Sequence, residues 1–165
     1  MVPIDDVTYV SPQNYDNILT DVSCKGMSDA CQRYWNVSPL SPVNPLPDMS
    51  YIKGQVLFNR RCVVVLPVKG QTQIVLHVPF VVDTCSPATY LSKASLDALN
   101  ECHSNQPKSS VVICNTQLVV SESPQNSHFN ELNILGAGFL ELSQYLFTVN
   151  FSELKAHLHL DNTEI

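Results

Sequence analysis

Short apolar stretches separated by polar, turn-forming residues make up most of the chain after residue 48. Stretches of about four to eight residues that are rich in β-branched and aromatic side chains are typical of β-strands. They occur at 55–58, 62–68, 73–82, 110–114, 117–121, 134–135, 145–151 and 156–160. The pattern therefore predicts an all-β fold, a small closed barrel, with no long amphipathic helix and no internal repeat.

The segment before this pattern has a different composition. Residues 1–48 hold six of the eleven prolines, and proline favours extended chain. We therefore predict an N-terminal arm and proline-rich linker at 1–48, followed by the β domain at 49–165. One short helix is expected in the arm and one or two in the domain. They are predicted at 28–35, 92–100 and 137–142, with Ser28 and Ser92 as N-caps.

The charge of the chain narrows the classes of partner. The formal net charge is −6, and lysine and arginine residues are scattered singly apart from Arg60-Arg61. A nucleic-acid interface needs a clustered basic face, so we expect no nucleic-acid partner. No apolar run approaches the roughly 20 residues of a membrane span, and the first residues lack the pattern of a signal peptide. We expect a cytoplasmic protein without membrane contact.

The six cysteines raise the question of a disulfide or metal framework. No two of them form the close Cys-x-x-Cys pair of a structural zinc site, and Cys102-His103 has no second close pair beside it. We therefore predict no metal and no cofactor. Without a secretory signal, reduced thiols are expected.

The most informative segment is Val81-Val82-Asp83-Thr84-Cys85-Ser86, at the end of an apolar strand. A carboxylate in this place is half buried, so it needs hydrogen-bond donors or a second acid nearby. An aspartate that simply begins a surface turn is the simpler interpretation. A second apolar segment that ends in glycine, Asn133-Ile134-Leu135-Gly136, follows about fifty residues later and favours a site.

Together the two segments resemble the retropepsins, the aspartic proteases of retroviruses, retrotransposons and their domesticated relatives. In that family the first motif is an apolar pair followed by Asp, Thr or Ser, and Gly, and the second is an apolar pair followed by Gly. The resemblance covers roughly residues 56–161. It implies a closed β-barrel, a homodimer and a peptide or protein substrate.

The chemistry of such a site requires two carboxylates that share one proton, so that one acts as base and the other as acid. This chain has one motif of that kind, so a working site needs two copies related by a twofold axis. The resemblance implies that Asp83 of each subunit forms this pair. It also implies that the Thr84 hydroxyl bonds across the axis and that Gly136 packs closely under the Asp83 loop.

Two positions depart from the family pattern. Cys85 stands where relatives have glycine, and Gly138 stands where they often have Asp or Asn, which puts the strength of the dimer in doubt. At a positive φ, a cysteine costs roughly 1–3 kcal/mol of backbone strain; otherwise its cost is steric. Cys85 and Ser86 are predicted to contact substrate.

The last predicted part of the site is a flap over the substrate. The hairpin at 111–120 turns at Asn115-Thr116, and these two residues are predicted to contact the bound peptide. This hairpin has no glycine at its tip, unlike the flaps of relatives. Cys85 and the glycine-free flap leave two functions open: an aspartic endopeptidase, or an inactive pseudoprotease that serves as a dimerisation or peptide-binding module.

Overall fold

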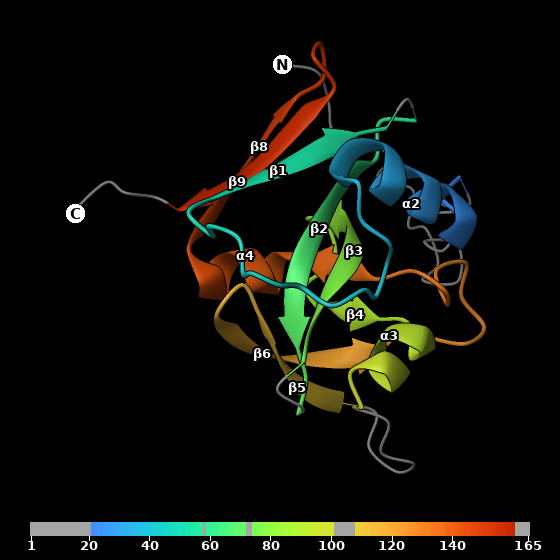
Figure 1. Ribbon diagram of the computed structural model, residues 1–165. Helices are drawn as coiled ribbons and strands as arrows, with labels where there is room; N and C mark the ends of the chain where they lie inside the picture. The colour runs from blue at the N-terminus through green and yellow to red at the C-terminus, as the bar shows by residue number, and fades with distance from the viewer. Residues whose placement is uncertain (1–20, 58, 72–73, 101–107, 161–165) are drawn as a thin grey trace, which may run out of the picture.

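The computed structural model describes residues 21–57, 59–71, 74–100 and 108–160 (Figure 1). Its strands are β1 (Tyr51–Val56), β2 (Cys62–Lys69), β3 (Val75–Asp83), β4 (Tyr90–Leu91), β5 (Lys108–Ile113), β6 (Thr116–Glu122), β7 (Ile134–Gly136), β8 (Tyr145–Asn150) and β9 (Lys155–Leu160). Its helices are α2 (Cys24–Ala30), the π-helix η2 (Cys31–Trp35), α3 (Lys93–Ala98) and α4 (Ala137–Ser143).

The strands form one sheet in the order β3-β7-β4-β6-β5-β2-β1-β9-β8, and β3 also pairs with β2. This last pairing closes the first six strands into a barrel, and β1, β9 and β8 extend from it as a twisted arm of sheet (Figure 1). Two of the pairings, β3–β7 and β4–β6, are parallel. The predicted all-β closed barrel with short helices is confirmed.

Alternation along the strands decides which residues fill the barrel. On β3 the even-numbered Leu76, Val78 and Phe80 face the main core, together with Val64, Leu66 and Val68 of β2. The odd-numbered residues of both strands therefore point outward. Yet β2 is buried at every position from Cys62 to Val68, so its outer face must also be covered.

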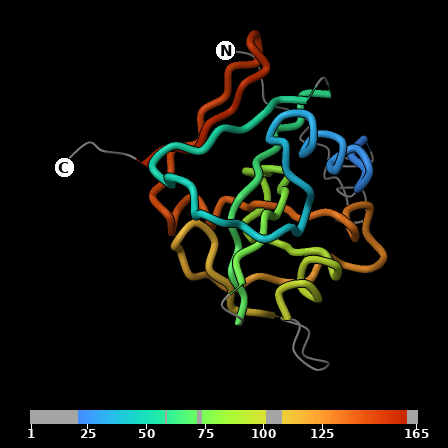
Figure 2. The backbone as a smooth tube through the Cα atoms, in the orientation of Figure 1, coloured from blue at the N-terminus to red at the C-terminus, as the bar shows by residue number. Residues whose placement is uncertain are grey.

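The cover of that outer face is the segment 22–49, which crosses the barrel in front of β2 and β3 (Figure 2). Part of it runs along β3: the Leu40 N–H donates to His77 O over 2.8 Å, the His77 N–H to Ser41 O over 2.9 Å, and the Val43 N–H to Val75 O over 2.8 Å. The predicted arm thus lies against the barrel from residue 22 on. The boundary at residue 48 stays a prediction.

The predicted start of the helix in this segment is wrong. Helix α2 begins at Cys24, and Ser23 caps it by accepting a 3.0 Å hydrogen bond from the Gly26 N–H. Ser28 lies inside the helix instead. The reason is tertiary: Met27 and Ala30 face the barrel and are buried, and a helix beginning at Ser28 would leave Met27 outside it.

The predicted cap at Ser92 and the predicted β5–β6 hairpin agree more closely with the structure. Ser92 caps α3 as expected, because its Oγ accepts from the Ser95 N–H at 3.2 Å. The β5–β6 hairpin is present, but its turn lies at Cys114-Asn115, where φ is 48° and 65°, and Thr116 already belongs to β6. Two consecutive left-handed residues are the geometry of a type I′ hairpin turn. None of the described helices is long and apolar enough to cross a bilayer.

Candidate active site

Asp83 is the last residue of β3, and the parallel partner β7 brings the second motif beside it. Val81 lies opposite Ile134, and Asp83 lies opposite Gly136. The two segments that are about fifty residues apart in sequence are therefore neighbours at one end of the barrel. The structure joins Asp83 and Gly136 in one site.

Gly136 is required there by close packing. An ideal Cβ built at this residue would lie 2.2 Å from the carbonyl oxygen of Ala88 and 2.8 Å from that of Ser86. Both atoms belong to the backbone of the loop that follows Asp83, so neither moves cheaply. Only glycine lets this loop lie directly against β7.

Backbone hydrogen bonds hold the loop in this position. Ala137 N–H donates to Ser86 O over 2.7 Å, and Gly138 N–H donates to Pro87 O over 3.1 Å. The Ser86 hydroxyl donates to Ala88 O over 2.8 Å, so it is used inside the loop. A Cβ at Gly138 would lie 2.8 Å from Pro87 O, which leaves no room for the acidic side chain that relatives carry.

Within the described part of the chain, a backbone N–H donates to the Asp83 carboxylate. The Cys85 N–H donates to Asp83 Oδ1 over 3.0 Å, while the Ser86 N–H donates to the Asp83 carbonyl over 3.1 Å. Asp83 is half buried, whereas the Thr84 and Cys85 side chains are exposed. The loop thus presents one carboxylate, one hydroxyl and one thiol to whatever lies next to it.

The backbone conformation at Cys85 decides whether a cysteine there costs backbone strain or only steric bulk. Its φ is not positive, so the cysteine carries no left-handed strain. Cysteine also keeps the N–H that a glycine would offer to Asp83. What remains is the bulk of a thiol beside the carboxylate.

The hairpin tip lies elsewhere in the chain's own barrel. The Cys114 N–H donates to Pro67 O over 3.2 Å, and Pro67 pairs with His77 of β3. His77 precedes Asp83 by six residues, which is about 20 Å along a strand. The structure therefore does not bring Asn115 and Thr116 together with Asp83 within one chain, and their contact with substrate stays a prediction.

An apolar cluster that sequence reasoning missed lies next to Asp83. Val81 has the same parity on β3 as Asp83 and therefore faces the same side. It packs in a cluster whose buried members are Val22, Met27, Val63, Val81, Leu132 and Ile134. The only sequence signal was the apolar character of both parities on β2, which implies that the outer face is covered.

The thiols differ in their reactivity. Burial raises the pKa of Cys31 to about 11 and that of Cys114 to about 12, and it also raises the pKa of Cys62. These three are protonated thiols at neutral pH. Of the described cysteines, Cys24 and Cys85 are exposed. The part of the chain that the structure describes has no cluster of three or more metal-ligating side chains, and Cys102 and His103 lie outside it.

Comparison with known proteins finds similarity in structure but none in sequence. No family model matches the chain, and no curated protein matches its sequence. Among solved structures, the chain is similar to a retropepsin-like aspartic protease from Rickettsia conorii. The two share 15% sequence identity with a TM-score of 0.47, over 67% of this chain and 90% of that one. The chain therefore has structural similarity, over most of its length, to a retropepsin-like aspartic protease.

Proposed function

We propose that this protein is an aspartic endopeptidase that works as a homodimer, with Asp83 of two chains as the catalytic pair. The observation that carries the proposal is the position of Asp83. It ends an apolar strand in register with Gly136, and the N–H of Cys85 holds its carboxylate. Asp83 is half buried, and backbone hydrogen bonds from Ala137 and Gly138 fix the loop that follows it. An aspartate that merely begins a surface turn would need none of these bonds, so the arrangement favours a functional carboxylate.

The reaction follows from two such carboxylates in one site. Two acids placed close together share one proton, because both cannot ionise at that distance. The ionised Asp83 takes a proton from a water molecule, whose oxygen attacks the carbonyl carbon of the peptide bond. The protonated Asp83 donates its proton to the carbonyl oxygen. As the C–N bond of the tetrahedral intermediate breaks, the Asp83 that took the water proton gives it to the leaving nitrogen, and a hydroxyl of the intermediate returns a proton to the other Asp83, which restores the pair.

Thr84 is proposed to position the pair. Its side chain is exposed in one chain and follows the catalytic residue directly, so a twofold axis at Asp83 places the two Thr84 residues near each other. A hydroxyl is both donor and acceptor and can bond to the partner loop. Cys85 lies one residue further and would border the bound peptide.

The free edge of β8 supports association between two copies. Within the described residues β8 pairs with β9 alone, and Leu146 on it is 44% exposed. An unpaired edge strand is a template for pairing with another strand. We propose that β8 of two chains meet and continue the sheet across the dimer.

One observation favours a second function. The exposed thiol of Cys85 adds bulk beside the carboxylate, where glycine leaves space for substrate. On this alternative the domain is a pseudoprotease that dimerises and binds peptides without cleaving them. The Cys85→Gly variant distinguishes the two, because it restores the space and leaves the Asp83 hydrogen bond in place.

The test uses the full chain. Its oligomeric state is measured by sedimentation, and cleavage of a mixture of unstructured peptides is followed by mass spectrometry at about pH 5, where one of two paired acids is ionised. Asp83→Asn should abolish cleavage. Asp97→Asn, at an exposed aspartate that pairs with Lys93 on α3, is the matched control and should leave it unchanged. Cleavage that survives Asp83→Asn contradicts the proposal, and no cleavage by either the native chain or Cys85→Gly supports the pseudoprotease.

A further inference from the structure

We propose that the segment 22–35 is an internal inhibitor, which occupies the surface beside Asp83 where the apolar side chains of a peptide substrate bind. This inference rests on the proposed function and deepens it, since it names both the regulator of the site and the class of side chain that the site accepts. The segment contains helix α2 and the π-helix η2.

The first step is the position of the covered surface. Val81 and Asp83 are two residues apart on β3, so their side chains leave the same face of the sheet. Val63 of β2 lies opposite Val81 on one side, and Ile134 of β7 lies opposite it on the other. These three apolar residues form a continuous strip across three neighbouring strands. Asp83 lies beside the middle of the strip, two residues beyond Val81 on β3.

The second step is to identify the side chains that cover this apolar strip. Val22 and Met27 pack on this strip and, with Leu132, complete one apolar cluster. Partly buried Trp35, Leu57, Tyr90 and Phe129 pack against the same cluster. Together these side chains bury the strip, because Val63 is 0%, Val81 1% and Ile134 2% exposed. A peptide laid beside Asp83 would need to place its own apolar side chains on the same atoms. The segment and such a peptide therefore compete for one surface, and Met27 marks the kind of side chain that fits, a long aliphatic one.

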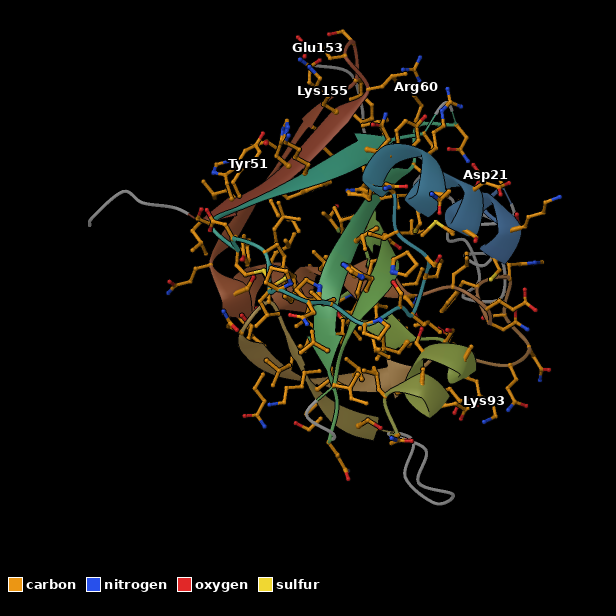
Figure 3. The ribbon with its side chains drawn as sticks, viewed as in Figure 1. Asp21, Tyr51, Arg60, Lys93, Glu153 and Lys155 are labelled. Carbon is orange, nitrogen blue, oxygen red and sulfur yellow. The ribbon has the colours of Figure 1, made fainter. Side chains whose placement is uncertain are left out.

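The third step is the way in which the segment is held. Arg61 Nε donates to the Asp21 carboxylate over 3.2 and 3.3 Å, and the Asn59 side chain donates to Asp21 O over 3.1 Å. Figure 3 shows Asp21 beside α2 and Arg60 in the turn between β1 and β2. At the other end, Trp35 Nε1 donates to Lys53 O over 3.1 Å. All three contacts are near the surface, where such bonds contribute little to stability.

The helix itself is also weak in isolation. α2, with seven residues, continues directly into η2, with five, and an isolated helix no longer than about 12–15 residues is marginal in water without packing partners. Gly26 lies inside α2 and lowers its helix propensity further. The segment is thus ordered by the surface that it covers. Among the described residues, a competing peptide has to displace this packing and the three contacts at the ends of the segment.

Peptide binding tests the inference without any catalysis. In the Asp83→Asn full chain, the binding of a fluorescein-labelled hexapeptide with two central leucines is measured by fluorescence anisotropy. Met27→Asp places a charge on the apolar strip, and Asp21→Ala removes the ion pair with Arg61. Met27→Asp should bind the peptide about tenfold tighter or more, and Asp21→Ala about two- to fivefold tighter, because the apparent affinity rises with the open fraction and a surface ion pair contributes little. The Asp21→Ala change lies outside the apolar cluster, so it keeps the test valid if Met27→Asp unfolds the chain.

The control removes a different surface ion pair. Glu153 and Lys155 pair at 2.8 Å at the tip of the β8–β9 hairpin (Figure 3), and Lys155→Ala should leave peptide binding unchanged. Hydrogen exchange of the backbone amide at position 27 reports whether the helix has opened, because in the native chain the Met27 N–H donates to Ser23 O. The inference is overturned if this amide exchanges faster in both the Met27→Asp and the Asp21→Ala chains while neither binds the peptide more tightly.

Cleavage assays then separate this inference from the proposed function. With Asp83 intact, Met27→Asp and Asp21→Ala should raise kcat/KM by the same factor as they raise binding. A gain in binding with no cleavage by any variant would refute the catalytic proposal and leave the internal inhibitor standing. Cleavage by the native chain that neither variant increases would refute the inhibitor and leave the protease standing.

Discussion

Replacing Gly136 with alanine places a methyl group where the backbone of the Asp83 loop already lies. The new Cβ would be 2.2 Å from Ala88 O and 2.6 Å from Ala88 C. An ordinary van der Waals contact needs at least about 3.4 Å, so the loop would have to move by about 1.2 Å. Such a shift lengthens the hydrogen bonds from Ala137 N–H to Ser86 O and from Gly138 N–H to Pro87 O.

The expected cost can be worked out from these contacts. Overpacking of this kind costs about 1–3 kcal/mol. Two weakened backbone hydrogen bonds add about 0.5–1.5 kcal/mol each. The free energy of unfolding should therefore fall by about 2–6 kcal/mol, a large part of the roughly 5–15 kcal/mol of an ordinary domain. With a urea m value of about 2 kcal/mol/M, the midpoint should fall by about 1–3 M.

Urea unfolding followed by circular dichroism measures this change, and Gly26→Ala is the matched control. At Gly26 the added Cβ would meet only the Ser23 side-chain oxygen at 3.3 Å, and the residue lies within α2. Alanine is favoured over glycine in a helix by about 1 kcal/mol, so this variant should be as stable as the native chain or more so. An unchanged urea midpoint for Gly136→Ala would refute the packing argument and, with it, the required proximity of the two motifs.

Three further predictions follow from single residues. Cys85→Gly should lower the free energy of unfolding by no more than about 1 kcal/mol, because the cysteine has no left-handed strain to relieve, while peptide cleavage rises; a clear gain in stability would contradict the backbone assignment. Burial raises the pKa of Cys114 from 9.0 to about 12 and that of Tyr145 from 10.0 to about 12, so the protonated forms stabilise the fold. That stability is complete below about pH 9 and is lost as the pH rises toward 12, so urea midpoints should fall over this window, and Cys114→Ala should flatten the fall. Leu146→Asp on the free edge of β8 should weaken the dimer in sedimentation experiments while leaving the unfolding of the single chain nearly unchanged.

The strands could be predicted because each carries its own signal. Runs such as Val63–Val68 are too apolar and too β-branched for anything but a buried strand. β4 could not be predicted, since two residues, Tyr90 and Leu91, give no period, and it is their pairing with Ser121 and Ile134 that makes them a strand. The start of α2 was missed for a similar reason. Ser23 and Ser28 are equal as caps, and only the packing of Met27 on the barrel decides between them.

In the candidate site, too, some features could be predicted from the sequence and others depend on tertiary packing. The adjacency of Asp83 and Gly136 was predictable from the resemblance of their two segments to the retropepsin motifs, and glycine suits such a close approach. The distance of the Asn115 turn from Asp83 was not, because a hairpin's sequence fixes its turn and register, whereas its place on the barrel depends on the pairing of β5 with the far end of β2. The covering role of Met27 likewise belongs to tertiary packing.

The outer face of β2 and β3 is covered in two different ways, and this difference gives a last prediction. Toward the start of β3, the segment at 40–43 is fixed by three backbone hydrogen bonds to Val75 and His77. Beside Asp83, the cover is a short helix held by apolar packing and a few surface contacts. Because the first kind of contact breaks only when the strand separates, the amides of Leu40 and Val43 should exchange more slowly than that of Met27. Equal protection of all three amides would mean that the cover opens as one unit, and a peptide could then reach Asp83 only by stripping the whole segment from the barrel.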